Sequence, residues 1–186
     1  MKNTLTYLMA ISCAIIFFFV SIIEANPKGN QVNGNLLQKY DYRIKNLLVS
    51  ETKVLRGFDF GTSYAIIKQK EKSAFIAEGT KFCLYQVKVG TKEFADVFYY
   101  IDDKKNVSGF AIAMVFRNGK EMNKLFRSFS DYFNERFGKF YVNDRGHREW
   151  KTSKGYYVEL VENYGEETVG LELEFFKQRS NFLNDL

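Results

Sequence analysis

The fold is decided by two adjacent segments, VSGFAIAMVF (107–116) and KEMNKLFRSFSDYFNERFG (120–138), which are joined by the dipeptide turn Asn118-Gly119. The first alternates large and small side chains, which is the period-two pattern of a β-strand. The second has apolar residues at spacings of three and four and a glycine at its end, as an amphipathic helix does. A strand followed by a one-faced helix predicts a helix layer on a sheet, so we expect an α+β fold.

The side chains of each segment can be assigned to one face or the other. The helix Lys120–Phe137 carries a stripe that we predict to be core, made of Met122, Leu125, Phe126, Phe129, Phe133 and Phe137. The strand has a large face, Phe110, Ile112, Met114 and Phe116, and a small face, Ala111, Ala113 and Val115. Small side chains permit close approach, so we expect a packed helix on the small face, with a ligand as the alternative.

The neighbouring segments extend the same plan. A short helix is predicted over 63–70, and the strands are predicted over 81–89, 94–101, 107–116, 140–142, 147–152, 156–161 and 168–176. We therefore expect an antiparallel β-sheet packed on one face by one long and one short α-helix, preceded by an N-terminal apolar targeting helix. An amphipathic helix is also predicted between Leu36 and Val54, either as a tether or packed against the domain.

The chain begins with an apolar segment. Residues 3–23 contain no charge and lie between Lys2 and Glu24. Such a stretch is typical of a secretory signal, but it is also close to the ~20 residues that span a bilayer. The alternatives are a cleaved signal peptide, an uncleaved membrane anchor and, from Ala10 to Cys13, a lipoprotein signal. Each predicts an exported protein that is periplasmic, at the cell surface or secreted, with possible membrane attachment through residues 1–25.

Composition bounds the rest. An aromatic content of 17% predicts a globular chain. We expect the chain to be divided into a targeting segment (1–25), a linker with the amphipathic helix (26–54), an α+β domain (55–178) and a tail (179–186). The net charge of +5 favours anionic lipid headgroups or cell-wall polymers as partners, and no nucleic acid is expected. Cys83 would stand alone once Cys13 is removed, so we expect no disulfide and a buried thiol, with a reactive thiol as the alternative.

The last hairpin allows its register to be tested. Pairing residues whose numbers sum to 331 places Tyr156, Val158 and Leu160 opposite Phe175, Leu173 and Leu171, all apolar and on one face. A shift by one residue would bury glutamates, so burial favours this register. The preceding strand, paired at sum 308, places Trp150 beside Val158.

That register predicts a row of carboxylates, Glu149, Glu159 and Glu172, on the opposite face. Like charges directly opposite each other are unfavourable, so something should relieve the row. Candidates are Lys151, Arg148 and Lys154, a basic partner, or a hard cation such as Ca²⁺. A solvated face with local lysines is the simpler interpretation.

Other chemistry has less support. His147 is the single histidine, and neither a G-x-S-x-G motif nor a P-loop occurs. We therefore predict no catalytic residue and no cofactor.

The order of elements carries one resemblance. Gly61-Thr62-Ser63 opens a short helix, three strands follow, and a Phe-striped helix ends at Phe137-Gly138-Lys139 before a meander that bears Trp150. Over residues 57–176 this plan resembles small exported bacterial α+β domains, the β-lactamase inhibitor protein and the BamE-type outer-membrane assembly lipoproteins. The resemblance implies non-enzymatic binding on an exported scaffold.

Three functions remain open from the sequence. The first is a non-catalytic binding or assembly module whose partner is an unknown protein or an anionic envelope component. The second is an envelope-acting enzyme that uses Glu149, Glu159 and Glu172. The third is a membrane-anchored structural protein.

The mass of the exported protein distinguishes the forms of the N-terminus. We expect intact-mass spectrometry to find a chain that lacks residues 1–25, because the uncharged stretch resembles a cleaved signal. A full-length mass recovered from the membrane fraction would instead establish the anchor.

Overall fold

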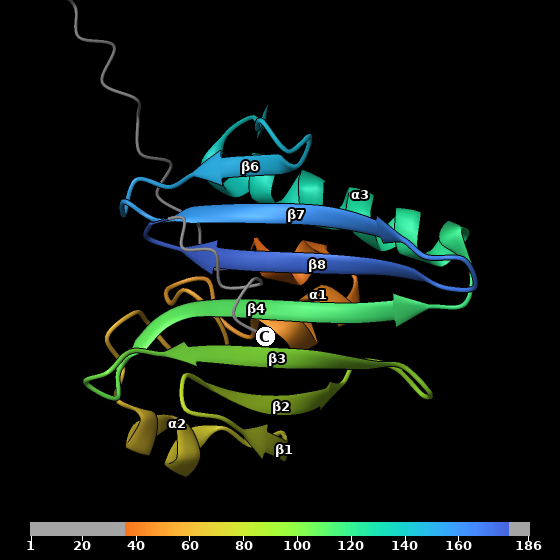
Figure 1. Cartoon of the computed structure of the whole chain (residues 1–186). Coiled ribbons are helices and arrows are strands. Elements are labelled where there is room, and N and C mark those ends of the chain that lie inside the picture. Colours follow the sequence, from red (N-terminus) through yellow and green to blue (C-terminus); the bar gives the residue numbers. More distant parts are fainter. Residues whose placement is uncertain (1–35, 179–186) are drawn as a thin grey trace, which may run out of the picture. The chain divides into compact units, whose positions relative to one another are not determined.

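A computed structural model describes residues 36–178, which form one antiparallel sheet with its helices on a single face (Figure 1). The strand order is β1-β2-β3-β4-β8-β7-β6-β5. The strands are β1 (Ala74–Glu78), β2 (Phe82–Lys88), β3 (Phe94–Ile101), β4 (Val107–Phe116), β5 (Tyr141–Val142), β6 (Arg148–Lys151), β7 (Tyr157–Tyr164) and β8 (Val169–Phe176). The predicted α+β class and antiparallel sheet are confirmed. The predicted targeting helix, the linker up to residue 35 and the tail from residue 179 lie outside the described residues.

The helices are α1 (Tyr42–Leu48), α2 (Tyr64–Lys70) and α3 (Gly119–Phe137), with a short 3₁₀ turn at Leu37–Lys39. Helix α3 begins where the Asn118 side chain accepts a hydrogen bond from the backbone N–H of Glu121, at 3.1 Å. It ends at Gly138, whose φ of 91° favours glycine. Helices α2 and α3 were predicted at nearly these bounds. No helix among residues 36–178 is long and apolar enough to cross a bilayer.

One strand was missed by the sequence. Strand β1 occupies the edge of the sheet, beside β2, and most of its residues are exposed. The alternation of buried and exposed residues that reveals a strand is therefore absent from this segment.

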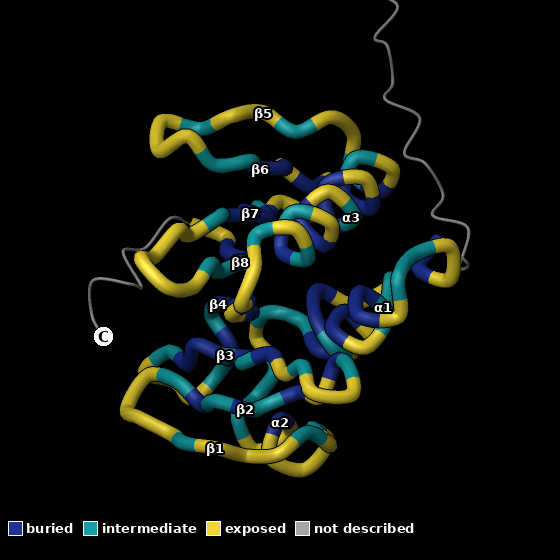
Figure 2. Tube along the Cα trace, turned by 90° about the vertical axis from the view of Figure 1, so that its right-hand side faces the viewer, coloured by how far each residue is buried: buried dark blue, intermediate teal, exposed yellow. Residues whose placement is uncertain are grey.

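The core lies between the sheet and the helices (Figure 2). Phe133 of α3 is fully buried, and its ring centroid lies 5.3 Å from that of Trp150 and 6.2 Å from that of Phe175. Ile44 and Leu47 of α1 belong to the same core, so α1 packs against the sheet. The sequence had left open whether this segment packs or only tethers.

The expectation of a packed helix on the small face of β4 was wrong. Phe110, Ile112 and Met114 are in the core with α3, whereas Ala111 and Ala113 lie on the other face of β4, opposite Glu174 and Glu172 of β8. The aromatic stripe of α3 gains more contact by packing against large apolar side chains than against alanines, because burial scales with apolar area. We call the face that carries Ala111 and Ala113 the outer face, and none of the described helices covers it.

Cys83 is fully buried in this core. Burial raises the pKa of its thiol to about 12, so the thiol stays protonated and unreactive. The buried small residue expected from the sequence is confirmed.

Replacing Phe133 by alanine should lower the free energy of unfolding by about 3–5 kcal/mol, because the cavity would lie where α3 meets β6 and β8. Urea denaturation followed by far-UV circular dichroism measures the loss. The matched control is Phe94→Ala, whose side chain is 49% exposed, and it should cost less than about 1 kcal/mol. Equal losses for the two variants would contradict this account of the core.

Candidate functional site

The outer face carries a row of carboxylates across β6, β7 and β8. Glu149 lies opposite Glu159, as predicted, and Glu159 lies opposite Glu174. The third member was predicted to be Glu172, and this is wrong: Glu172 lies opposite Val161. The β7–β8 hairpin pairs residues whose numbers sum to 333, two more than the register derived from the sequence.

The turn explains the difference. The backbone N–H of Gly165 donates to the carbonyl of Thr168 at 2.9 Å, so the loop consists of Glu166 and Glu167. The predicted register would have placed the loop one residue earlier. A two-residue shift returns every side chain to the same face, and burial cannot distinguish the two registers.

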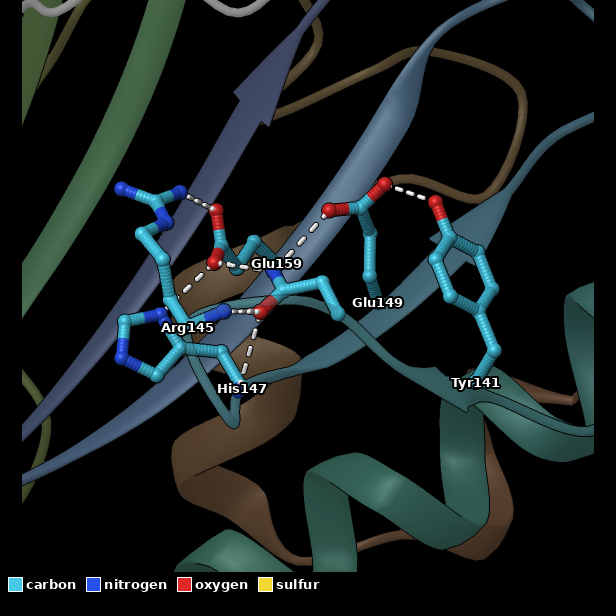
Figure 3. A network of polar contacts seen from close by, with 6 residues as sticks. Tyr141, Arg145, His147, Glu149 and Glu159 are labelled. Atoms are coloured by element: carbon cyan, nitrogen blue, oxygen red, sulfur yellow. Dashed lines mark hydrogen bonds and ion pairs between the residues drawn. The ribbon is translucent and has the colours of Figure 1, made fainter.

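Glu159 is fully buried within a polar network (Figure 3). Its carboxylate accepts a hydrogen bond from the side-chain amide of Asn143 at 2.7 Å and pairs with the guanidinium of Arg145. The Nδ1 atom of His147 lies 2.7 Å from Glu159 Oε1. All three partners come from the turn between β5 and β6, which folds over the outer face at this point.

Glu149 belongs to the same network. It is 2% exposed, accepts a hydrogen bond from the Tyr141 hydroxyl, and lies 3.1 Å from the side-chain nitrogen of Asn143. The Oδ1 atom of Asn143 accepts backbone hydrogen bonds from Arg145 and His147, at 3.0 and 3.1 Å, and so shapes the turn. One asparagine therefore joins the turn to two carboxylates.

The cations expected to relieve the row lie elsewhere. Arg148 points to the helix face, where it donates to Ser130 Oγ at 2.6 Å, and Lys154 donates to the carbonyl of Thr52 at 3.0 Å. Lys151 lies over the ring of Tyr157, 6.0 Å from its centroid. The row is relieved instead by Arg145, which no spacing rule places beside a strand fourteen residues away.

Glu174 is the member of the row that remains strained. Burial, followed by the charges of Glu159 and Glu172, raises its pKa from 4.5 to about 7. Neither Glu172 nor Glu174 forms an ion pair with a lysine or arginine in the described part of the chain. A negative charge at this point of the outer face is therefore unfavourable.

A pocket of about 590 Å³ lies beside the network. Its walls include Tyr141, Glu149, Tyr157 and Phe176. Glu174, the carboxyl group with the raised pKa, is not among the lining residues. Within residues 36–178, no three His, Cys, Asp or Glu side chains are arranged to hold a metal ion, so we assign no cation to the row.

A second pocket, of about 580 Å³, opens on the outer face of β2, β3 and β4, beside the start of α3. We call it the outer-face pocket, and it is lined by Gln86, Lys92, Glu93, Phe94, Asp96, Ala113, Val115, Phe116, Arg117, Asn118 and Glu121. Phe94 is 49% exposed and Val115 is 72% exposed, whereas Ala113 supplies a low floor between them. The small face of β4 therefore borders an open apolar recess.

The polar wall of the outer-face pocket includes an oxygen without a partner. The Oε2 atom of Glu93 is buried and accepts no hydrogen bond from the residues that the structure describes. The other oxygen, Oε1, lies 3.8 Å from the guanidinium of Arg43. Asp96, also in the wall, accepts from the amide of Gln86 at 3.2 Å. The pocket thus combines apolar side chains with hydrogen-bond acceptors.

The sequence carried a partial signal for these residues. Asn143, Arg145 and His147 alternate within a turn, and an asparagine at the start of a turn is typical of side-chain bonding to the backbone two residues on. That pattern could have placed the three side chains together, but not beside Glu159. The outer-face pocket could not be found from the sequence, because its lining comes from segments that are brought together only by the sheet.

Glu174→Gln tests the strained position. The folded chain holds the Glu174 proton more tightly than the unfolded chain does, so this contribution to stability is complete below about pH 4.5 and is lost as the pH rises through about 7. The variant cannot ionise, so at about pH 8 its free energy of unfolding should exceed that of the parent by on the order of 1–2 kcal/mol, and the gain should shrink at about pH 5. Urea denaturation at both values measures it.

The control for this comparison is Glu166→Gln, in the exposed loop outside the row. A gain for Glu174→Gln that is the same at both pH values would contradict the assignment.

Comparison of the chain with protein-family models, with curated proteins and with solved structures finds no match. The resemblance to small exported α+β domains therefore rests on the order of elements alone. What the protein does has to be argued from its own surfaces.

Proposed function

We propose that the protein is a binding module and that its partner docks on the outer face, with one side chain in the outer-face pocket. The observation that carries the proposal is the pair Phe94 and Val115, which are 49% and 72% exposed on a sheet face that no described helix covers. Large apolar side chains that gather on an open surface typically mark a contact site.

The shape of the surface supports docking. On β4 the outer face carries the small residues Ala111 and Ala113, whereas Phe98 of β3 stands beside Ala111. Small side chains next to large ones allow the backbone of a partner to approach the sheet, while the partner's side chains fill the space above the alanines. On this proposal, a partner makes the close approach to the small face of β4 that the sequence analysis expected of a helix.

The chemistry of the recess narrows the partner. Apolar contact with Phe94 and Val115 favours an aliphatic or aromatic group, and the carboxylates of Asp96 and Glu121 in the lining favour a hydrogen-bond donor beside it. We therefore propose a protein segment that carries an apolar side chain and a neutral or basic donor.

The proposal places this module in the cell envelope. The basis is the uncharged stretch of residues 3–23, followed by the Gly- and Asn-rich residues 26–35. On this proposal the module works in the periplasm or at the cell surface, either free or attached through residues 1–25.

An enzyme is the second candidate, and one observation favours it. The pKa of about 7 for Glu174 lies near neutral pH, which suits a general acid or base. However, Glu174 is not among the residues lining the pocket beside the carboxylate row, and a general acid needs to reach its substrate. The binding module is therefore preferred.

Site-specific photo-cross-linking tests the binding proposal. We expect a photoreactive phenylalanine at Phe94 to give a discrete cross-linked product in the cell envelope, because this side chain borders the outer-face pocket. The same probe at Arg127, exposed on α3, is the control and should give none. Val115→Glu should abolish the product at residue 94 by placing a charge in the recess. Equal products at both positions, or none at residue 94, would refute the proposal.

A further inference from the structure

The β1 end of the sheet exposes a second group of apolar side chains. Phe75 and Ile76 of β1 are 49% and 50% exposed, and Ile66 of α2 is 40% exposed. Both views place β1 and α2 at the same end of the described region, with β1 at the edge of the sheet (Figures 1 and 2). Three large apolar side chains are therefore presented to solvent at one extremity.

Lysines surround this group. The exposed lysines at this end are Lys68, Lys70, Lys72 and Lys81. Of the nearby acids, Glu71 is buried against the guanidinium of Arg56 at 2.9 Å, and Glu78 pairs with Lys68 at 2.7 Å. The positive charges of Lys70, Lys72 and Lys81 have no ion-pair partner among the described residues. The apolar extremity thus carries an excess of positive charge.

The arrangement of Lys68 suits an interface between water and hydrocarbon. Its Nζ atom lies 4.7 Å from the ring centroid of Tyr64 and 5.9 Å from that of Phe75. A lysine in this position covers apolar surface with its methylenes and keeps its charge at the rim. Aromatic and aliphatic tips ringed by lysines are typical of proteins that lie on a lipid surface.

The strand itself is poorly suited to adding another strand. The pairing of β1 with β2 shifts between Phe75 and Ala77, which leaves Ile76 as the extra residue of a β-bulge. A bulge at a sheet edge interrupts the regular ladder and discourages edge-to-edge pairing. The exposed side chains, more than the backbone of the edge, are thus the feature available to a partner.

We propose that the β1 end, defined by Ile66, Phe75, Ile76 and the lysines Lys68, Lys70, Lys72 and Lys81, docks on an anionic lipid surface. Charge complementarity carries this choice of partner, since lipid headgroups supply the negative charge and the acyl boundary accepts the apolar tips. The contact is separate from residues 1–25 and does not depend on the outer-face pocket. It would fix the orientation of the domain at the membrane and leave the outer face free.

A local fluorescent probe tests the proposal. An environment-sensitive dye such as NBD is attached to Ile76→Cys in the full chain, with Cys13→Ser to remove that thiol and Cys83 protected by burial. Vesicles of phosphatidylcholine with about 30% phosphatidylglycerol should raise the emission severalfold, whereas vesicles of phosphatidylcholine alone should not. The dye reports only its own surroundings, so insertion of another segment gives no signal. A dye at Val142→Cys, 61% exposed at the other edge of the sheet, is the position control.

Charge variants complete the test. Lys70→Gln with Lys72→Gln should weaken vesicle binding about 25-fold, at about fivefold per lysine. Lys124→Gln with Arg127→Gln removes the same charge from exposed positions of α3 and should leave the dye signal at residue 76 unchanged. Equal responses at residues 76 and 142, equal responses to the two kinds of vesicle, or a rise with protein concentration in the absence of vesicles would each overturn the proposal. The last outcome would indicate a second copy of the chain at this edge.

Discussion

A single buried row of side chains sets the arrangement of the sheet. Directly opposed residues cross six strands on the helix face, and the row consists of Cys83, Tyr99, Phe110, Phe175, Val158 and Trp150. Phe133 of α3 packs against Phe175 and Trp150, so the helix lies directly on this row. Because neighbouring side chains of a strand alternate between faces, fixing this row fixes what every strand presents on the other face.

The carboxylate row follows from that constraint. Residues next to the buried row along β6, β7 and β8 are Glu149, Glu159 and Glu174, and their registry is inherited from the core. The charge of Glu159 is balanced by the turn between β5 and β6, through Asn143, Arg145 and His147. The turn forms no ion pair with Glu174, whose pKa is raised by burial and by the neighbouring carboxylates. The core thus dictates where the outer face is strained.

The outer-face pocket on β2, β3 and β4 and the β1 edge of the sheet present different surfaces. The outer-face pocket offers apolar walls and carboxylate acceptors, whereas the β1 end offers exposed apolar side chains with lysines. The first suits a protein segment that brings a donor, and the second suits an anionic lipid surface. The net charge of +5 alone had favoured anionic partners for the chain as a whole. On the proposal of docking on a lipid surface, the preference for anionic partners belongs to the β1 end.

The sequence by itself determined the types of all the strands and helices except β1, the approximate bounds of α2 and α3, the antiparallel class of the sheet and the pairing of Glu149 with Glu159, since these depend on periodicity and on local turns. Tertiary structure decided three further things. Helix α3 covers the large face of β4, because facing aromatic surfaces bury more area than alanines do. Glu174 replaces Glu172 in the row, because a two-residue shift preserves every face and only the Gly165–Thr168 hydrogen bond selects the register. Arg145 meets Glu159 because the hairpin folds across the sheet, a contact that depends on three-dimensional position and leaves no trace in spacing.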